Sequence, residues 1–240
     1  TITSLENWVS QARHAGYVAI DTETTSLDES RAELVGVSMS IEPGYACYIP
    51  LGHRPIPSTS AKGVELESPM QIQMDQAMAI IRPLFADPAV IKIGQNIKYD
   101  MRVLAHYDVG IHPVDDTMLL SYVLDGGSHG HGMDALAEFH LGHTTIKYKE
   151  VVGIGQSQIT FDHVPLDKAL AYAAEDADVT LRLHRLLKPR LVREHMTAVY
   201  ERLERPLIPV LASMESNGIQ VNEDELKRLS EDFTTRMAVL

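Results

Sequence analysis

Acidic side chains that could bind metal ions occur at three separate places along the chain. Asp21 and Glu23 end an apolar run that predicts a strand, and residues two apart on a strand point to the same side. Asp100 lies inside a predicted helix, too far from its start to be an N-cap. Asp176 lies in another predicted helix, one turn after Tyr172. Carboxylates gathered from these places would repel one another unless divalent cations lay between them.

Hard oxygen ligands of this kind favour Mg²⁺ or Mn²⁺, and two such ions about 4 Å apart can activate water and stabilise the leaving oxygen of a phosphodiester. Each acidic group alone also has an ordinary interpretation. Asp21 and Glu23 could be acids of an ordinary turn at the end of a strand. Tyr172 and Asp176 could form a hydrogen-bonded pair on a helix surface. Asn96, one turn before Asp100, is interpreted as a helix cap or a residue that orients a metal ligand. The combination of groups, more than any one, predicts a two-metal site.

The apolar periodicity and the turn residues predict an α/β fold, a sheet covered by helices. Strands are predicted at 17–20, 34–39, 45–49 and 90–93, of which the first three form an antiparallel meander. Helices are predicted at 4–16, 70–85, 96–107, 117–124, 133–141, 166–187, 203–216 and 223–240. Segment 51–69, rich in Pro, Ser and Gly, predicts a loop.

The 240 residues have a globular composition and a net charge of −12, from 21 basic and 33 acidic residues. This charge disfavours a general basic surface for nucleic acid, unless bound cations reverse the local sign. No apolar run approaches the ~20 residues of a membrane span, and no signal peptide is visible, so we expect a soluble, cytoplasmic protein. The single cysteine, Cys47, cannot form an internal disulfide. A start at Thr1 without methionine indicates an excised fragment.

Several other patterns give little support to other chemistry. His129 and His131 lie in a glycine-rich loop without cysteine partners, so this pair predicts no zinc site. Cys47 has no evident base, and no Gly-x-Ser-x-Gly motif occurs. Asp116 precedes an apolar helix and is predicted to be its N-cap. The basic stretch 182–205 is interpreted as a solvated helix face or a domain junction. A phosphate-binding surface is the less favoured interpretation.

Four sequence blocks, taken in order and spacing, resemble a known family. They are Asp21-Thr-Glu-Thr-Thr-Ser-Leu-Asp28, Gly94-Gln-Asn-Ile-Lys-Tyr-Asp100, Asp116-Thr-Met118 and Tyr172-Ala-Ala-Glu-Asp-Ala-Asp-Val-Thr180. Together they resemble the 3′→5′ proofreading exonuclease domain of bacterial family A DNA polymerases, in the tyrosine subgroup of the DEDD exonucleases. The resemblance implies a ribonuclease H-like mixed sheet flanked by helices, followed by a short helical C-terminal segment.

By this resemblance the metal ligands are Asp21, Glu23, Asp100 and Asp176, and they hold two ions of Mg²⁺ or Mn²⁺. Tyr172 would position the attacking water.

The resemblance also suggests residues that contact the substrate. Leu27 either presses between the terminal bases of the DNA or packs as an ordinary apolar residue. Gln95, Asn96 and Tyr148 are further candidates for the substrate cleft. Near Gly130 the sequence departs from related polymerases, which often carry a basic residue there that contacts the strand.

The resemblance divides the chain into an exonuclease domain, residues 1–191, and the start of a family A polymerase domain, residues 192–240. The boundary is placed near Leu191 because the long helix is predicted to end after Pro189. We expect hydrolysis of the 3′-terminal phosphodiester of single-stranded or frayed DNA, with release of nucleoside 5′-monophosphates. The expected partner is the rest of the polymerase domain, in a monomer of the bacterial cytoplasm and nucleoid with no membrane contact.

Two alternatives remain open at this point. The first is a ribonuclease D-like RNA exonuclease with the same four acids and tyrosine, against which the polymerase-like C-terminal residues argue. The second is an exonuclease-like structural or strand-binding module that has lost catalysis, which would normally show as missing carboxylates.

Overall fold

The computed structural model describes residues 1–55 and 69–238, and within them the chain forms a five-stranded mixed sheet in the order β3-β2-β1-β4-β5. Its strands are β1 (Tyr17–Thr24), β2 (Leu34–Glu42), β3 (Tyr45–Pro50), β4 (Ile91–Gly94) and β5 (Val114–Asp116). The first three form the predicted antiparallel meander, and β4 and β5 join it in parallel beside β1. The predicted α/β, ribonuclease H-like mixed sheet is therefore confirmed.

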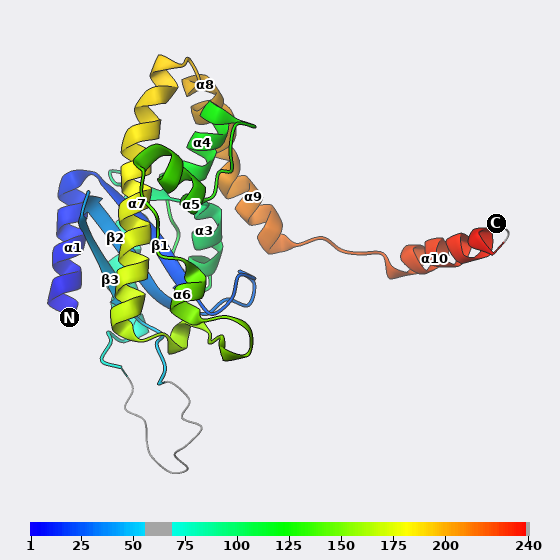
Figure 1. Cartoon of the computed structure of the whole chain (residues 1–240), viewed down its shortest axis with the longest axis horizontal. Helices are drawn as coiled ribbons and strands as arrows, with labels where there is room; N and C mark the ends of the chain where they lie inside the picture. The colour runs from blue at the N-terminus through cyan, green and yellow to red at the C-terminus, as the bar shows by residue number, and fades with distance from the viewer. Residues whose placement is uncertain (56–68, 239–240) are drawn as a thin grey trace, which may run out of the picture.

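Helices cover both faces of this sheet (Figure 1). On one face, α1 (Ile2–Ala15) and α2 (Met74–Phe85) pack together over the largest apolar cluster. Across the other face runs α7 (Leu166–Arg193), in contact with β1, β2, β3 and β4. The remaining helices before α7 are α3 (Ile97–Ala105), α4 (Thr117–Asp125), α5 (Met133–Leu136), the π-helix η1 (Ala137–Leu141), α6 (Tyr148–Val152) and the 3₁₀ turns η2 (Gly155–Ser157) and η3 (Phe161–His163).

A stripe of alanines allows α7 to approach the sheet closely. Ala169, Ala173 and Ala177 follow one another at four-residue intervals, so they share one helix face, and all three are fully buried. Because these side chains are small, the helix backbone lies near the strands. Asp176 directly precedes Ala177 in this helix. The stripe thus sets the distance between Asp176 and the end of β1.

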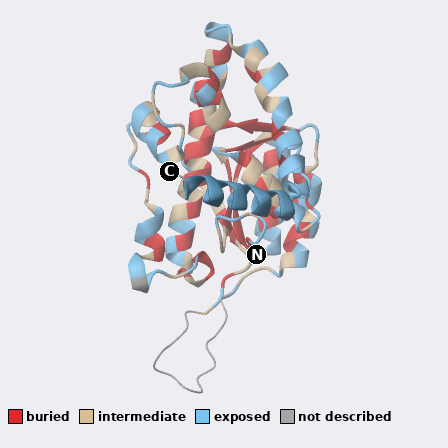
Figure 2. Cartoon of the chain, turned by 90° about the vertical axis from the view of Figure 1, so that its right-hand side faces the viewer, coloured by how far each residue is buried: buried red, intermediate tan, exposed pale blue. Residues whose placement is uncertain are grey.

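After α7 the chain continues through α8 (Thr197–Val199), the π-helix η4 (Tyr200–Glu204), α9 (Arg205–Asn217) and α10 (Glu223–Met237). Helix α9 packs against α3, where Glu215 pairs with Lys98 and Arg102 and Ile208 is buried. Helix α10 extends away from the body and has no buried residue (Figures 1 and 2). In the described part of the chain, no helix combines the length and the apolar character that crossing a bilayer requires.

Several predicted boundaries were wrong. Helix α2 starts at Met74, not residue 70, because the Gln71 side chain bonds both backbone groups of His53 and holds the preceding segment extended. Helix α7 continues through Pro189 to Arg193, so the prediction that this helix ends near the proline was wrong. The predicted helix 133–141 is divided between α5 and η1, and strand β5 was not predicted. Residues 56–68 of the predicted loop lie outside the described residues.

The basic stretch 182–205 makes ion pairs with buried and half-buried acids, so it is not simply a solvated helix face. Asp115, fully buried at β5, accepts hydrogen bonds from His184 Nε2 at 2.8 Å and Lys188 Nζ at 2.9 Å. Tyr200 donates to the same carboxylate at 3.1 Å, and Arg205 contacts it at 3.4 Å. Burial would raise the pKa of Asp115, but the His184 hydrogen bond and the Lys188 charge outweigh it and lower the pKa to about 2.

We therefore expect Asp115→Asn to lower the free energy of unfolding by about 3 kcal/mol, because it leaves half-buried basic side chains without their buried counter-charge. In the wild type this contribution should persist above pH 4 and be lost as the pH falls through about 2, since the folded pKa lies below the unfolded one. Urea denaturation measures both effects. Asp232→Asn, which removes an exposed ion pair with Arg236, is the control and should change stability by less than about 0.5 kcal/mol. Equal effects of the two substitutions would contradict the role given to Asp115.

Candidate active site

A cavity of about 290 Å³ opens where the ends of β1 and β4 meet α3 and α7. All of the candidate site residues line it: Asp21, Glu23, Leu27, Gln95, Asn96, Asp100, Tyr148, Tyr172 and Asp176. They come from segments more than 150 residues apart in sequence, and the fold brings them together. The remaining lining residues are Thr22, Thr24, Ser26, Tyr99 and Met133.

Three of the four carboxylates form a tight group. One oxygen each of Asp21, Glu23 and Asp176 lies within 4.8 Å of the others, a spacing that could hold a metal ion. Asp21 and Glu23 are two apart on β1 and do face one cavity, as the strand period predicts. Asp100 lies beside this group in the same cavity, and its Oδ1 accepts a hydrogen bond of 2.6 Å from Thr22 Oγ1.

The electrostatics of the group are those of crowded, buried anions. Burial raises the pKa of Asp21, Glu23 and Asp100 well above their ordinary values, and the charge of a neighbouring carboxylate adds to each shift. Burial, followed by the charge of Glu175, raises the pKa of Asp176 to about 7, against a hydrogen bond from Tyr172 that lowers it. No Lys or Arg is among the described residues that line the cavity. Within residues 1–55 and 69–238, the lining therefore offers no cation to balance these acids.

The donor set fits a hard divalent cation. Glu23 Oε1 is buried and has no hydrogen-bond partner, so it is free to bind an ion. The available ligand atoms are all carboxylate oxygens, which suit Mg²⁺ and Mn²⁺ better than softer ions. An unpaired buried oxygen surrounded by like charges is costly unless a cation compensates it.

Tyr172 stands in an aromatic group at one wall of the cavity. Its ring lies 6.1 Å from the ring of Tyr148 and 5.9 Å from that of Phe161. Burial, followed by the charges of Asp176 and Glu23, raises the pKa of its hydroxyl far above 10. The hydroxyl is therefore protonated at neutral pH and available as a hydrogen-bond donor.

Asn96 was interpreted as a helix cap or a residue that orients a ligand, and its side chain makes no capping bond. Asp116 caps α3 instead, by accepting from the backbone N–H of Asn96 and Ile97, and it also caps α4 through Met118 and Leu119. The predicted N-cap role of Asp116 is confirmed. Asn96 adopts φ 59°, the left-handed region in which asparagine is enriched, and its exposed side chain faces the cavity.

The other candidate residues differ in how they are held. Leu27 is 90% exposed at the cavity rim, so the structure gives no support to ordinary packing there. Gln95 is fixed, since its Nε2 donates to His131 O at 2.8 Å and its Oε1 accepts from Thr117. Tyr148 begins α6 and is partly exposed. Leu27 and Tyr148 thus frame the opening, while Gln95 belongs to its wall.

Sequence reasoning missed two supporting residues. Thr22 orients Asp100, and Tyr99 bonds Thr24 Oγ1 and donates to Ser26 O, each at 2.5 Å. Tyr99 thereby fixes the loop that carries Leu27. Both residues lie inside the sequence blocks that carried the resemblance, and their positions next to the acids were the available signal.

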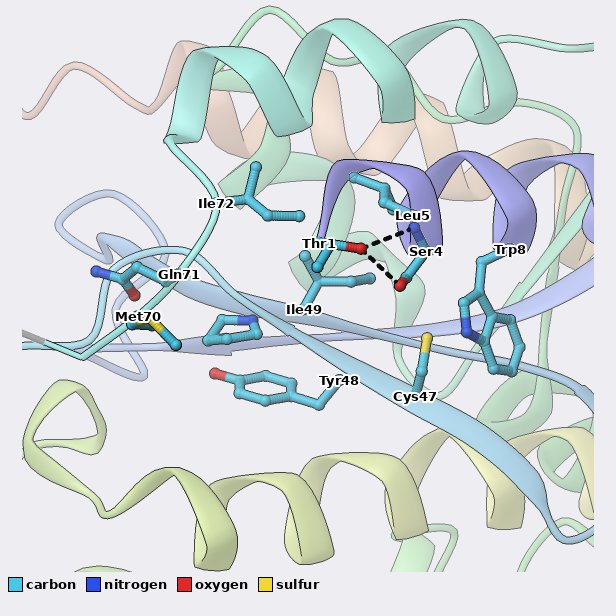
Figure 3. A pocket seen from close by; sticks show the side chains of 11 residues that line it. Thr1, Ser4, Leu5, Trp8, Cys47, Tyr48, Ile49, Met70, Gln71 and Ile72 are labelled. Carbon is cyan, nitrogen blue, oxygen red and sulfur yellow. Dashed lines mark hydrogen bonds between the residues drawn. The ribbon is translucent and has the colours of Figure 1, made fainter.

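A second cavity, of about 370 Å³, lies between α1, β3 and the segment before α2 (Figure 3). Its lining is mainly apolar, with Leu5, Trp8, Cys47 and Ile72 among its side chains, and it contains no carboxylate. Burial raises the pKa of the Cys47 thiol to about 12, so the thiolate needed for nucleophilic attack is absent at neutral pH. The chemistry of the chain therefore concentrates in the acidic cavity.

A ribonuclease H-like sheet with clustered carboxylates at its strand ends defines a class of metal-dependent nuclease domains. A model of the 3′–5′ exonuclease domain of family A DNA polymerases matches residues 1–192, and the chain belongs to this family. The family is metal-dependent. The chain is accordingly a 3′–5′ exonuclease domain, as the sequence blocks predicted.

A sequence relative agrees with this assignment, and solved structures share the fold. The chain is 48% identical to DNA polymerase I of Rhizobium leguminosarum over 100% of its own length and 24% of the relative's. It thus spans about a quarter of that protein. Among solved structures, Pol1 of M. smegmatis matches with a TM-score of 0.71 and 21% identity, covering 96% of this chain and 34% of that one. Escherichia coli RNase D matches with a TM-score of 0.65 and 16% identity, covering 88% and 49%.

The raised pKa values predict how the metal-free protein responds to pH. Because the folded state holds protons that the unfolded state releases between about pH 4 and 7, stability in EDTA should fall as the pH rises through this window. Asp176→Asn should reduce the fall by on the order of 1–4 kcal/mol and weaken the stabilisation by Mg²⁺ at pH 8. Urea denaturation at pH 5 and pH 8 checks both. Asp167→Asn, at an exposed position of the same helix, is the control; an unchanged pH response in Asp176→Asn would refute the electrostatic account.

Proposed function

We propose that this exonuclease domain hydrolyses the 3′-terminal phosphodiester of DNA and releases nucleoside 5′-monophosphates. The observation that carries the proposal is the group of oxygens from Asp21, Glu23 and Asp176 in an open cavity of a chain that belongs to the polymerase A exonuclease family. An unpaired oxygen on Glu23 and the lack of a lining cation support a role in metal binding rather than in structure.

Asp21, Glu23, Asp100 and Asp176 would hold two ions of Mg²⁺ or Mn²⁺. Such ions, when bound, would supply activation of a water molecule and stabilisation of the charge on the departing 3′ oxygen. The contribution of the chain is to keep the four carboxylates fixed on one strand end and two helices before substrate arrives. Thr22 supports this arrangement by holding Asp100 at 2.6 Å.

Tyr172 would orient the attacking water by a hydrogen bond. Its raised pKa favours the neutral hydroxyl, which makes it a poor base at neutral pH and a suitable partner for a water oxygen. Its ring contacts with Tyr148 and Phe161 hold the hydroxyl in one place beside Asp176. Glu23, with its unpaired oxygen, is the carboxylate best able to accept a proton from the same water.

The cavity suits the end of a single strand. Its volume of about 290 Å³ is of the order of a single nucleotide. Leu27 projects at the rim and would press between the last two bases, while Tyr148, Gln95 and Asn96 line the path of the strand. Single-stranded or frayed 3′ ends are the proposed substrates.

The division of the chain into domains and its partner are proposed from the relatives. Residues 1–191 would form the exonuclease domain and residues 192–240 the start of a polymerase domain, with the remainder of that domain as partner of the chain. The absence of any buried residue in α10, among the described residues, supports a partner surface that this chain does not contain. We propose that the protein acts as a monomer in the bacterial cytoplasm, at the nucleoid.

A ribonuclease D-like activity on RNA is the second candidate, supported by the fold likeness to Escherichia coli RNase D. Magnesium titration against labelled single-stranded DNA and a matched RNA separates the two. We expect Mg²⁺-dependent shortening of DNA from the 3′ end with release of mononucleotides, and slower cleavage of RNA. Asp176→Ala should abolish hydrolysis, with a residual rate below about one thousandth of wild type, because a ligand of a shared site is lost.

The control for this experiment is Asp167→Ala on the same helix, which should cleave DNA at the wild-type rate. Faster cleavage of RNA than DNA would favour the ribonuclease. Failure of the wild type to cleave either polymer with Mg²⁺ or Mn²⁺ would identify a strand-binding module, and full activity in folded Asp176→Ala would reject the metal-site assignment.

Tyr172→Phe keeps the ring and its aromatic contacts but removes the hydroxyl, so we expect DNA and metal affinity to be nearly unchanged. The chemical step should slow by about 10²-fold, the lower end for acid–base and positioning groups, because bound metals retain most of the water activation. Single-turnover cleavage at saturating DNA and Mn²⁺ measures this step. Tyr45→Phe, which alters a ring stacked on Trp8 away from the cavity, is the control. A wild-type rate for Tyr172→Phe would make Tyr172 a packing residue only.

A further inference from the structure

A second group of metal-ligating side chains lies outside the acidic cavity. Asp125 ends α4, His129 follows in the next loop, and His140 lies on the π-helix η1. One ligand atom from each residue lies within 4.8 Å of the other two. Both histidine Nε2 atoms are 3.9 Å from Asp125 Oδ2. The elements that carry them lie side by side with α7 (Figure 1).

The two ring nitrogens have no hydrogen-bond partner. His129 Nε2 and His140 Nε2 are both buried and unpaired. The His140 side chain is only 8% exposed, so water does not compensate its nitrogen. A buried polar atom without a partner is unfavourable, and two of them directed at one carboxylate indicate a missing positive group, either a proton or a metal ion.

The hydrogen bonds around the group favour a metal over a proton. His129 Nδ1 lies 2.8 Å from Gly130 O, and since a carbonyl can only accept, Nδ1 carries a hydrogen and Nε2 is the nitrogen that can present a lone pair. A ring that donates one N–H to a carbonyl and offers its other nitrogen is the usual arrangement of a metal-binding histidine.

Arg190 keeps the carboxylate charged and oriented. Its Nη1 and Nη2 donate to Asp125 Oδ2 and Oδ1, each at 2.8 Å, and this hydrogen bonding lowers the pKa of Asp125. Carboxylates that bind metals commonly accept such an additional hydrogen bond. Two imidazole nitrogens without hydrogen-bond partners and one anionic oxygen therefore converge on one point.

We propose that Asp125, His129 and His140 form a binding site for a borderline divalent cation, of which Zn²⁺ is the representative. Two nitrogen donors and one oxygen donor suit Zn²⁺, whereas Mg²⁺ prefers oxygen donors alone. Ligand atoms of a tetrahedral zinc site lie about 3.3 Å apart, so a side-chain movement of about half an ångström closes the observed 3.9 Å gaps. Water completes the fourth position.

The sequence argued against zinc at His129 and His131. Their rings are neighbours, with centroids 5.3 Å apart, but only His129 belongs to the group of ligand atoms. His131 Nδ1 is 2.8 Å from Ser121 Oγ, outside the group, while the ligands that join His129 come from α4 and η1. The backbone carbonyl of His131 accepts from Gln95 in the wall of the acidic cavity. An ion bound by Asp125, His129 and His140 therefore tethers the loop that supports this wall.

The test measures Zn²⁺ binding directly. The reference protein is the chain with Asp21→Asn and Asp176→Asn, which keeps Zn²⁺ out of the acidic cavity. Competition with a chromogenic chelator should show one bound equivalent of Zn²⁺. Adding His140→Gln should weaken Zn²⁺ affinity by at least about 100-fold. Loss of a residue that only supports a ligand costs up to about 100-fold, and loss of the ligand itself should cost at least as much. His106→Gln, at an exposed histidine on another face, is the matched control and should leave affinity unchanged.

A second measurement needs no change in the cluster. Co²⁺ added to the reference protein should give the visible absorption bands of a four-coordinate site with nitrogen ligands, and Zn²⁺ should displace them. The proposal is overturned if the reference protein binds no Zn²⁺ equivalent, or if a folded His140→Gln variant binds Zn²⁺ as tightly as the control. It is equally overturned if ¹⁵N chemical shifts show His129 as an imidazolium in the presence of Zn²⁺, because the group would then be an ion pair.

Discussion

The mutual repulsion of carboxylates in one buried cavity is the constraint on which the rest of this structure depends. Asp21, Glu23 and Asp176 lie within contact range of a single ion, with Asp100 beside them and no basic residue among the described residues of the lining. The protein tolerates this arrangement because the elements that carry the acids are held by packing elsewhere. The buried apolar face of β1 and the alanine stripe of α7 place the acids close together whether or not they repel.

Neighbouring acids at β5 show what a structural carboxylate looks like in the same protein. Asp116 accepts four backbone N–H groups at the starts of α3 and α4, and Asp115 is surrounded by His184, Lys188 and Arg205. Both are as buried as the cavity acids, yet each has partners supplied by the chain. The cavity acids differ in that their compensation must come from outside. Burial alone therefore does not identify a functional acid; what distinguishes the cavity acids is a group of buried carboxylates with no Lys or Arg among the described residues that line their cavity.

The same criterion separates the histidines. His184 and His143 each bond a carboxylate at 2.8 Å and need nothing further. His129 and His140 present unpaired nitrogens to a carboxylate that Arg190 already holds. The oxygen-only donors of the acidic cavity and the mixed donors near α4 would select different ions. Two sites of different chemistry can thus coexist in one small domain.

The sequence by itself determined the order of most elements, the α/β class and the candidate residues that line the cavity. Local rules account for part of this, since strand alternation places Asp21 and Glu23 on one side and helix periodicity places Tyr172 beside Asp176. The substrate-contact candidates, Leu27 among them, came from the family resemblance. Tertiary structure alone decided that β5 exists, that α7 passes through Pro189, that Asp116 rather than Asn96 caps α3, and that His129 meets His140. Each of these depends on hydrogen bonds or contacts between segments distant along the chain. Local propensity and spacing contain no information about such partners, because the free energy that selects them arises only when the segments are packed together.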